Sequence, residues 1–231
     1  VMVSTENQFR ELIKNKRFFI ETLLVVENKA RQRVPFIYND IQADVDKTAT
    51  GMDIWVKPSS VGFSTERIAN RLVDTLTNPG TNTVLVAYED FITERLLSKV
   101  NFFYNHLESL HIPGFPAIHH SSTYEKTFNF IVDGVVVSTS SIYIASARSK
   151  TAGRAEVIHH LLLDEHAFYI EQSSENIIAP ALARVPPEGT VDSFSTPNGE
   201  ENEFHEWYVN AKAGKSIFTA HFYPWFVHKE Y

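Results

Sequence analysis

The segment from His159 to Glu165 reads His-His-Leu-Leu-Leu-Asp-Glu, and it constrains the fold more than any other stretch of the chain. A continuous apolar run is typical of a parallel strand that is covered on both faces. Two adjacent carboxylates, Asp164 and Glu165, end this run. Active sites of open α/β sheets lie at the carboxyl ends of such strands. We therefore expect one acid to hold a metal ion and the other to act on water, which indicates nucleotide hydrolysis if a phosphate-binding loop lies elsewhere.

Strand-like and helix-like patterns alternate along the rest of the chain. Strand patterns lie at 53–57, 83–88, 141–147, 190–194 and 216–222, and helical patterns lie at about 64–76, 91–110, 175–183 and 201–211. Apolar runs around Asp133-Gly134 predict an added β-hairpin over 128–138. We expect an α/β fold with a mostly parallel sheet and helices on both faces, in one domain.

The composition excludes several classes of chemistry. The chain has 231 residues and no cysteine, which excludes disulfides, cysteine zinc sites and thiol catalysis and favours an intracellular protein. No apolar run approaches the roughly 20 residues of a membrane span, so no membrane partner is expected. The net charge of -7 argues against a whole surface that binds nucleic acid. Any DNA contact is then local, transient or supplied by other domains or subunits.

The stretch at 54–72 has the strand–loop–helix arrangement of a phosphate-binding loop. Gly62 allows a close approach of the backbone to a phosphate, and the amides that begin the next helix favour an anion. Ser64 stands in the first helical turn, where a hydroxyl can ligate Mg²⁺. Phe63 replaces the usual loop lysine, and the nearest substitute is Lys57. Alone, this pattern also fits an ordinary strand-to-helix turn.

The order of loop and acidic strand assigns roles to the polar groups. Asp164 would hold Mg²⁺ through water between the terminal phosphates, and Glu165 would orient or deprotonate the attacking water. The polar loop Ser195-Thr196-Pro197-Asn198 follows the next strand and is placed to sense the γ-phosphate. Adjacent acids at a strand end are also commonly only solvated, so both interpretations stay open at this point.

These segments resemble the ATPase motifs of the large terminase subunits of tailed bacteriophages. The stretch from Lys57 to Thr65, Lys-Pro-Ser-Ser-Val-Gly-Phe-Ser-Thr, is similar to their deviant Walker A, and the stretch from Leu161 to Glu165 is similar to their Walker B. The polar loop at 195–199 resembles their coupling motif, and Tyr223-Pro224-Trp225 resembles the end of their motor domain. The motifs follow the family's order over nearly the whole chain.

The resemblance implies a P-loop NTPase fold of the RecA-like (ASCE) type, with ATP and Mg²⁺ as ligands. A single ATPase domain over 1–231 would comprise an adenine-motif region at 1–50, a P-loop core at 51–222, and at 223–231 the start of a linker to an absent nuclease domain. The residues so implied are Gln42, Lys57, Ser59, Ser60, Val61, Gly62, Phe63, Ser64 and Thr65 for ATP; Ser64 and Asp164 for the metal; Glu165 and, on a neighbour's ATP, Arg154 for catalysis; and Ser195, Thr196, Pro197 and Asn198 for coupling.

Two departures from the family pattern concern the cations. Ser59 replaces the family's loop arginine and Phe63 the lysine of ordinary P-loops, so Lys57 is the candidate replacement. Simpler interpretations also exist, because Gln42 fits a helix surface and Arg154 fits an ordinary surface arginine.

The implied function is hydrolysis of ATP to drive double-stranded viral DNA into a procapsid. The implied partners are double-stranded DNA, the portal protein and the small terminase subunit, with a homo-oligomeric ring when assembled and a monomer in isolation. The implied location is the host cell cytoplasm, transiently on the procapsid, and no nuclease activity is expected from these residues. The alternatives are a helicase-like DNA translocase, which would normally carry a second motor lobe, and a non-catalytic assembly protein with a degenerate Walker A.

Overall fold

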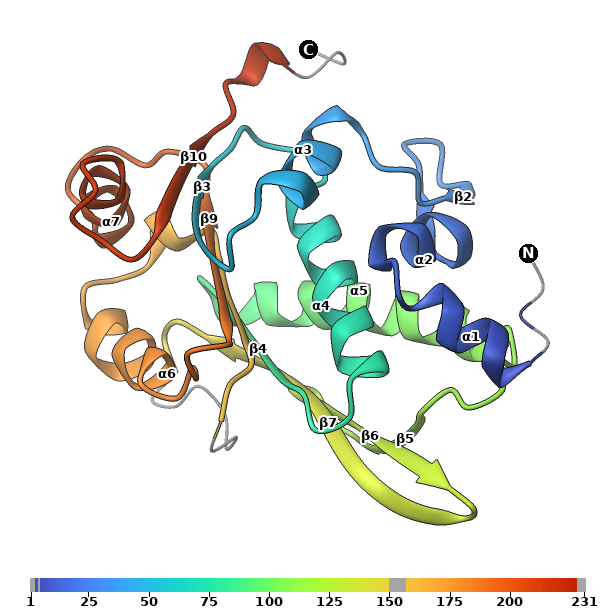
Figure 1. Cartoon of the computed structure of the whole chain (residues 1–231). Coiled ribbons are helices and arrows are strands. Elements are labelled where there is room, and N and C mark those ends of the chain that lie inside the picture. Colours follow the sequence, from blue (N-terminus) through green and yellow to red (C-terminus); the bar gives the residue numbers. More distant parts are fainter. Residues whose placement is uncertain (1–2, 4, 150–156, 228–231) are drawn as a thin grey trace.

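An eight-stranded sheet forms the centre of the computed structural model, which describes residue 3 and residues 5–149 and 157–227. The strand order is β10-β3-β9-β8-β4-β7-β6-β5, with parallel pairing from β10 to β7 and antiparallel pairing of β7, β6 and β5. Helices α1 to α5 cover one face, and α6 and α7 cover the other (Figure 1). The predicted α/β fold, with a mostly parallel sheet and an added hairpin, is confirmed.

The elements alternate along the chain in the way that the sequence patterns indicate. The strands of the sheet are β3 (Met52–Val56), β4 (Asn82–Ala87), β5 (Ala117–Ser121), β6 (Glu125–Val132), β7 (Val135–Ser146), β8 (His160–Asp164), β9 (Thr190–Ser195) and β10 (Thr219–Phe222), and β1 (Val25–Glu27) pairs separately with β2 (Arg33–Pro35). The helices are α1 (Glu6–Leu12), α2 (Lys16–Leu23), α3 (Asp40–Thr48), α4 (Phe63–Thr77), α5 (Asp90–Ser109), α6 (Ala179–Leu182) and α7 (Glu203–Lys212). Among the described residues, no helix combines the length and the apolar character needed to cross a membrane.

Strand β8 is buried on both faces, as its leucine run predicts. Leu162 belongs to the larger core, on the side of α1 to α5, whereas Leu161 and Leu163 belong to the core on the opposite face of the sheet. This division follows from the alternation of side chains along a strand. All three leucines are fully buried. The strand is therefore held firmly, and the acids that follow it have a fixed position at the edge of the sheet.

Several elements differ from the predictions made from the sequence. The residues from about 6 to 16 also look helical in the sequence, and the structure has α1 over Glu6–Leu12 and then a separate helix, α2, which Asn15 caps. Helix α4 begins at Phe63, one residue before the expected start at about 64, since Gly62 supplies the turn. The strand expected at 141–147 is the second half of β7, which continues unbroken from the hairpin. The helix expected at 175–183 is a π turn followed by the short α6. These differences leave the phosphate loop and the acidic strand where they were expected.

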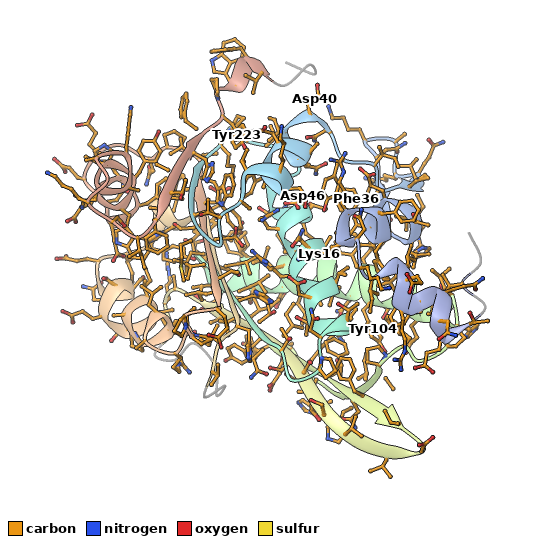
Figure 2. The ribbon with its side chains drawn as sticks, in the orientation of Figure 1. Lys16, Phe36, Asp40, Asp46, Tyr104 and Tyr223 are labelled. Carbon is orange, nitrogen blue, oxygen red and sulfur yellow. The ribbon has the colours of Figure 1, made fainter. Side chains whose placement is uncertain are left out.

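The inner face of α4 carries charged residues that are paired inside the protein. Arg71 donates to Asp192 of β9 from Nη2 and Nε over 2.7 and 3.1 Å, and Arg67 approaches the same carboxylate at 3.4 Å. Lys16 of α2 contacts Asp74 at 2.7 Å, and Figure 2 shows Lys16 beside α4. Because a buried charge without its partner is strongly destabilising, these pairs fix α4 against β9 and α2.

The pKa of the Asp192 carboxyl group lies below its usual range. Burial alone would raise the pKa of Asp192, but the guanidinium groups of Arg71 and Arg67 lower it to about 2. A carboxylate with a lowered pKa stabilises the fold above its unfolded pKa of about 3.9. That contribution is lost as the pH falls through about 2. The ion pairs therefore hold α4 in place throughout the neutral range.

Arg71→Met is expected to lower the free energy of unfolding by about 3 kcal/mol, because Asp192 keeps its buried charge and loses its best partner. Urea unfolding followed by circular dichroism measures the change. The exposed pair of Arg10 and Glu6 provides the control, since Arg10→Met is expected to cost less than about 1 kcal/mol. Equal losses in the two variants would contradict the stabilising role of the buried pair.

Candidate functional site

The phosphate-loop segment between β3 and α4 turns at Gly62. This residue is the N-cap of α4 with φ 74°, in the left-handed region that favours glycine. A Cβ atom at Gly62 would lie 2.7 Å from Nε2 of Gln42, so a larger residue here would displace the Gln42 side chain. Nε2 of Gln42 donates to the carbonyl of Gly62 over 3.0 Å, and Nδ2 of Asn39 donates to that of Val61 over 3.0 Å. The loop is therefore held in shape by α3 and its N-cap.

Phe63 stands where ordinary P-loops have lysine, and its side chain lies in the core. Its ring packs 5.7 Å from Trp55 of β3 and 5.0 Å from Phe194 of β9, and the residue is only 3% exposed. The side chain anchors the first turn of α4 on the sheet and carries no charge. Only the backbone of Phe63 can therefore contribute to a phosphate contact.

Ser64 and Asp164 bring two oxygen ligands together from elements 100 residues apart. Because Gly62 begins the helix, the Ser64 hydroxyl is not used as a cap, and its Oγ donates to Oδ1 of Asp164 over 2.8 Å. Burial raises the pKa of the Asp164 carboxyl, and the hydrogen bond from Ser64 opposes that shift. Hydroxyl and carboxylate oxygens suit Mg²⁺. The donor set fits the predicted metal, and the assignment itself stays a prediction.

Glu165 follows β8 in a strained backbone conformation and is bonded from two sides. Its φ is 53°, in the left-handed region that few glutamates adopt. Oε2 accepts from the amide and hydroxyl of Thr196 over 3.0 and 3.2 Å and from the Ser195 hydroxyl over 3.3 Å. Oε1 pairs with the ammonium group of Lys57, a residue that is 4% exposed. The predicted catalytic acid is thus joined directly to the predicted coupling loop.

The rest of the coupling loop contacts the segment after Glu165 and the groove beside α7. Nδ2 of Asn198 donates to the carbonyl of Ala167 over 3.0 Å, and the Ala167 amide donates to Oγ of Ser195 over 3.2 Å. Pro197 lines a groove together with Phe204 of α7. The predicted coupling loop thus lies between the segment after Glu165 and the groove beside α7.

These groups surround an open cavity of about 380 Å³. That volume is near the lower end of the range for ligand sites, about 300–1,000 Å³. The lining combines hydroxyls, two acids, two bases and a few apolar side chains: Ser59, Ser60, Ser64, Tyr88, Ile92, Arg95, Leu96, Lys99, Asp164, Glu165, Phe168 and Thr196. The cavity lies at the carboxyl edge of the parallel strands, where the sequence predicted a site.

Arg95 and Lys99 supply positive charge that the sequence analysis missed. They lie one turn apart on α5, so both side chains face the same cavity. Burial lowers the pKa of the Lys99 ammonium, the carboxylate of Asp164 opposes the shift, and the positive charges of Arg95 and Lys57 reinforce it. The available signal was the spacing of two bases on the helix after β4, but a helical pattern alone does not show which way that face points.

Three predicted site residues require separate description. Gln42 is 5% exposed, its amide is engaged by the Gly62 carbonyl and by the Asn39 amide, and it does not line the cavity. Lys57 also lies outside the lining, with its ammonium on Glu165. Arg154 lies outside the described residues. The roles of all three stay predictions.

A strand–loop–helix turn thus faces two acids at the carboxyl edge of a parallel sheet. No protein-family model matches the sequence, and no curated protein matches it. Among solved structures, the large terminase ATPase domain of Thermus phage P74-26 matches with a TM-score of 0.64 and 18% identity, covering 82% of each chain. The HK97 bacteriophage large terminase matches with a TM-score of 0.69 and 15% identity, covering 91% of this chain. The large terminase of the thermophilic bacteriophage D6E in complex with ATP-gamma-S matches with a TM-score of 0.57 and 12% identity, covering 84% of this chain.

The chain therefore has the fold of phage large terminase ATPase domains, and the resemblance seen in the motifs is confirmed at the level of the fold. It spans 43% of the HK97 large terminase and 47% of the D6E large terminase. It covers most of the separate P74-26 ATPase domain.

Gly62→Ala is expected to destabilise the domain by more than the 1–2 kcal/mol or so that a left-handed alanine costs, because its Cβ also displaces Gln42. Gly134→Ala is the matched control, since Gly134 has φ 77° and open space around its Cβ position. Urea unfolding of both variants measures the difference. If the two variants lost the same stability, the close packing of Gln42 under the loop would be wrong.

Proposed function

We propose that this chain is the ATPase motor domain of a phage large terminase, which hydrolyses ATP to drive double-stranded DNA into a procapsid. The observation that carries the proposal is the hydrogen bond of 2.8 Å between Ser64 and Asp164, next to Glu165 in the same cavity. A large terminase with this fold has been solved in complex with ATP-gamma-S. Both findings support ATP as the substrate.

The phosphate loop and the acidic strand divide the binding of the nucleotide. Backbone amides at 60–65, at the N-terminal end of α4, bind the phosphates, since the first amides of a helix have no intrahelical partner and favour an anion. Ser64 and Asp164 hold Mg²⁺, which neutralises charge on the terminal phosphates. Arg95 and Lys99 face the same cavity and supply the cations that the loop itself lacks.

Glu165 orients or deprotonates the attacking water. Thr196 holds one oxygen of its carboxylate, so the direction of the group is fixed before the substrate binds. Lys57 occupies the other oxygen.

The contacts of the polar loop support a coupling role. Glu165 accepts a hydrogen bond from Thr196, and Asn198 donates one to the chain just after Glu165. Loss of the γ-phosphate would therefore move a loop that borders α7. The proposed partners are double-stranded DNA, the portal protein, the small terminase subunit and further copies of this chain in a ring. Arg154 acts on a neighbour's ATP, and the motor works in the host cytoplasm while attached to the procapsid.

A non-catalytic assembly protein with the same fold is the second candidate. Its support is the absence of charge in the loop at 58–65, where Ser59 and the buried Phe63 replace the expected cations. A helicase-like translocase shares the proposed ATPase site and differs in its DNA product. Binding of ATP without any phosphate release, with and without DNA, would favour the non-catalytic candidate.

Glu165→Gln is expected to lower phosphate release from ATP by at least about 100-fold, because a general base typically contributes that much. Affinity for ATP should change little, since the variant keeps the side chain's size and its contact with Thr196. Turnover is measured by phosphate release and affinity by calorimetry. The exposed Glu171 gives the control, and Glu171→Gln should turn over normally. Unchanged turnover in Glu165→Gln would show that another group activates water.

Arg95→Met and Lys99→Met are each expected to weaken binding of Mg-ATP about tenfold, because a charge-assisted hydrogen bond contributes about 1.5–3 kcal/mol. Calorimetric titration measures the affinities. Lys47→Met is the control, since Lys47 is an exposed base on α3. If Lys57→Met lost much of its affinity for Mg-ATP and the Arg95 and Lys99 variants lost none, Lys57 and not the α5 bases would bind the phosphates.

A further inference from the structure

A second cavity lies beside the first, between β1, the start of α4 and α5. Its volume is about 280 Å³, and its lining residues are Val26, Glu27, Thr65, Ser98, Lys99, Phe102 and Phe103. Lys99 lines both cavities, and Thr65 follows the proposed metal ligand Ser64 directly. The two cavities are therefore neighbours at the first turn of α4, which is where a bound triphosphate would lie.

The lining of the second cavity suits a flat heteroaromatic ring. Phe102 is half-buried and presents an aromatic ring, and Val26 adds an apolar wall. Glu27 is exposed at the mouth, where its carboxylate can accept a hydrogen bond from an amino group. Arg33 stands opposite Glu27 in the register of the β1–β2 ladder, and its guanidinium lies over the Phe102 ring, 5.3 Å from the ring centre, so a base would stack on the opposite face of that ring. Aromatic stacking with one polar contact is a common way to bind a nucleobase.

The size of the second cavity also suits a base more than a whole nucleotide. At about 280 Å³ it is slightly smaller than the range of complete ligand sites, about 300–1,000 Å³. The first cavity contains the hydroxyls, acids and bases that a triphosphate and its metal require. One ligand that extends across Lys99 would occupy both.

Gln42 is poorly placed to contact a base in this structure. Its Nε2 donates to the carbonyl of Gly62, its Oε1 accepts from the amide of Asn39, and it is 5% exposed. It lines neither of the two cavities. One donor and one acceptor position of the Gln42 amide are thus used on the phosphate loop and on the N-cap of α3, and a side chain that moved into either cavity would leave the turn of the loop without this support.

We propose that the base of the bound nucleotide occupies this second cavity, stacked on Phe102, with its exocyclic amino group donating to Glu27. This inference rests on the proposed function, because it takes ATP as the ligand. The terminal phosphates lie at Ser64 and Asp164, the inner phosphates lie at Thr65 and Lys99, and adenine lies beyond them. Gln42 shapes the loop and makes no contact with the base.

The test compares Mg-ATP with Mg-tripolyphosphate, which has the phosphates and no base, by calorimetric titration of the full chain. Phe102→Ala is expected to weaken the binding of ATP about tenfold, because one stacking partner is lost. The affinity for tripolyphosphate should stay unchanged. Phe102→Leu keeps most of the apolar volume and should show the same pattern. Phe18→Ala is the control, because Phe18 is 55% exposed on α2. This variant should bind both ligands with normal affinity.

Two further variants separate the base contacts. The wild-type protein should bind ATP more tightly than purine riboside triphosphate, which lacks the amino group, and Glu27→Ala should remove that preference. Gln42→Ala should weaken the binding of ATP and of tripolyphosphate by the same factor, since Gln42 affects both ligands through the shape of the loop.

The possible results distinguish this inference from the proposed function. Unchanged ATP affinity in both Phe102 variants would overturn the base site while ATP binding stands. If Gln42→Ala lost affinity for ATP alone and not for tripolyphosphate, the base site would be overturned as well, and the base contact would be assigned to Gln42. If the wild-type protein bound neither ligand, the proposed function would fall, and the base site would fall with it.

Discussion

The buried carboxylate of Asp192, held by Arg67 and Arg71, attaches α4 to β9, and the rest of the candidate site depends on that attachment. Strand β9 lies between β3 and β8, so a helix fixed to β9 starts beside the ends of all three strands. The phosphate loop, the acids after β8 and the polar loop after β9 consequently meet at one edge. The contact between Ser64 and Asp164, 100 residues apart, follows from this arrangement.

The sequence predicted those parts of the site that depend on backbone position. A leucine run ending in two acids identified β8, and the spacing of Gly62 and Ser64 identified the loop, because strand ends and helix starts are set by local patterns. The same patterns could not predict the direction of individual side chains. Nothing in a helical periodicity shows that Lys99 faces the acids or that Gln42 is occupied by the loop, since both depend on how α5 and α3 pack. The long β7 and the exposed β5 were missed in part because neither has the alternation of a half-buried strand along its full length.

The distribution of positive charge differs from that of an ordinary P-loop. Phe63 uses the lysine position to fasten α4 to the sheet, and the cations that face the cavity come from α5. Under the proposed function, the positive charge that compensates the phosphates comes from an element outside the loop, so the strength of this compensation depends on the distance between α4 and α5. Lys99 stands at the centre of this arrangement, because it lines both cavities and its ammonium is partly desolvated without a ligand.

The left-handed backbone of Glu165 is a cost to the fold that the contacts of its side chain offset. A glutamate with φ 53° is strained by about 1 kcal/mol, and glycine would adopt the same conformation without that strain. Glycine would, however, leave the ammonium of Lys57 buried without its partner, and the loss of such a partner costs more than this strain. The strained turn and the ion pair therefore depend on each other, and neither Lys57 nor Glu165 can be replaced alone without a loss of stability.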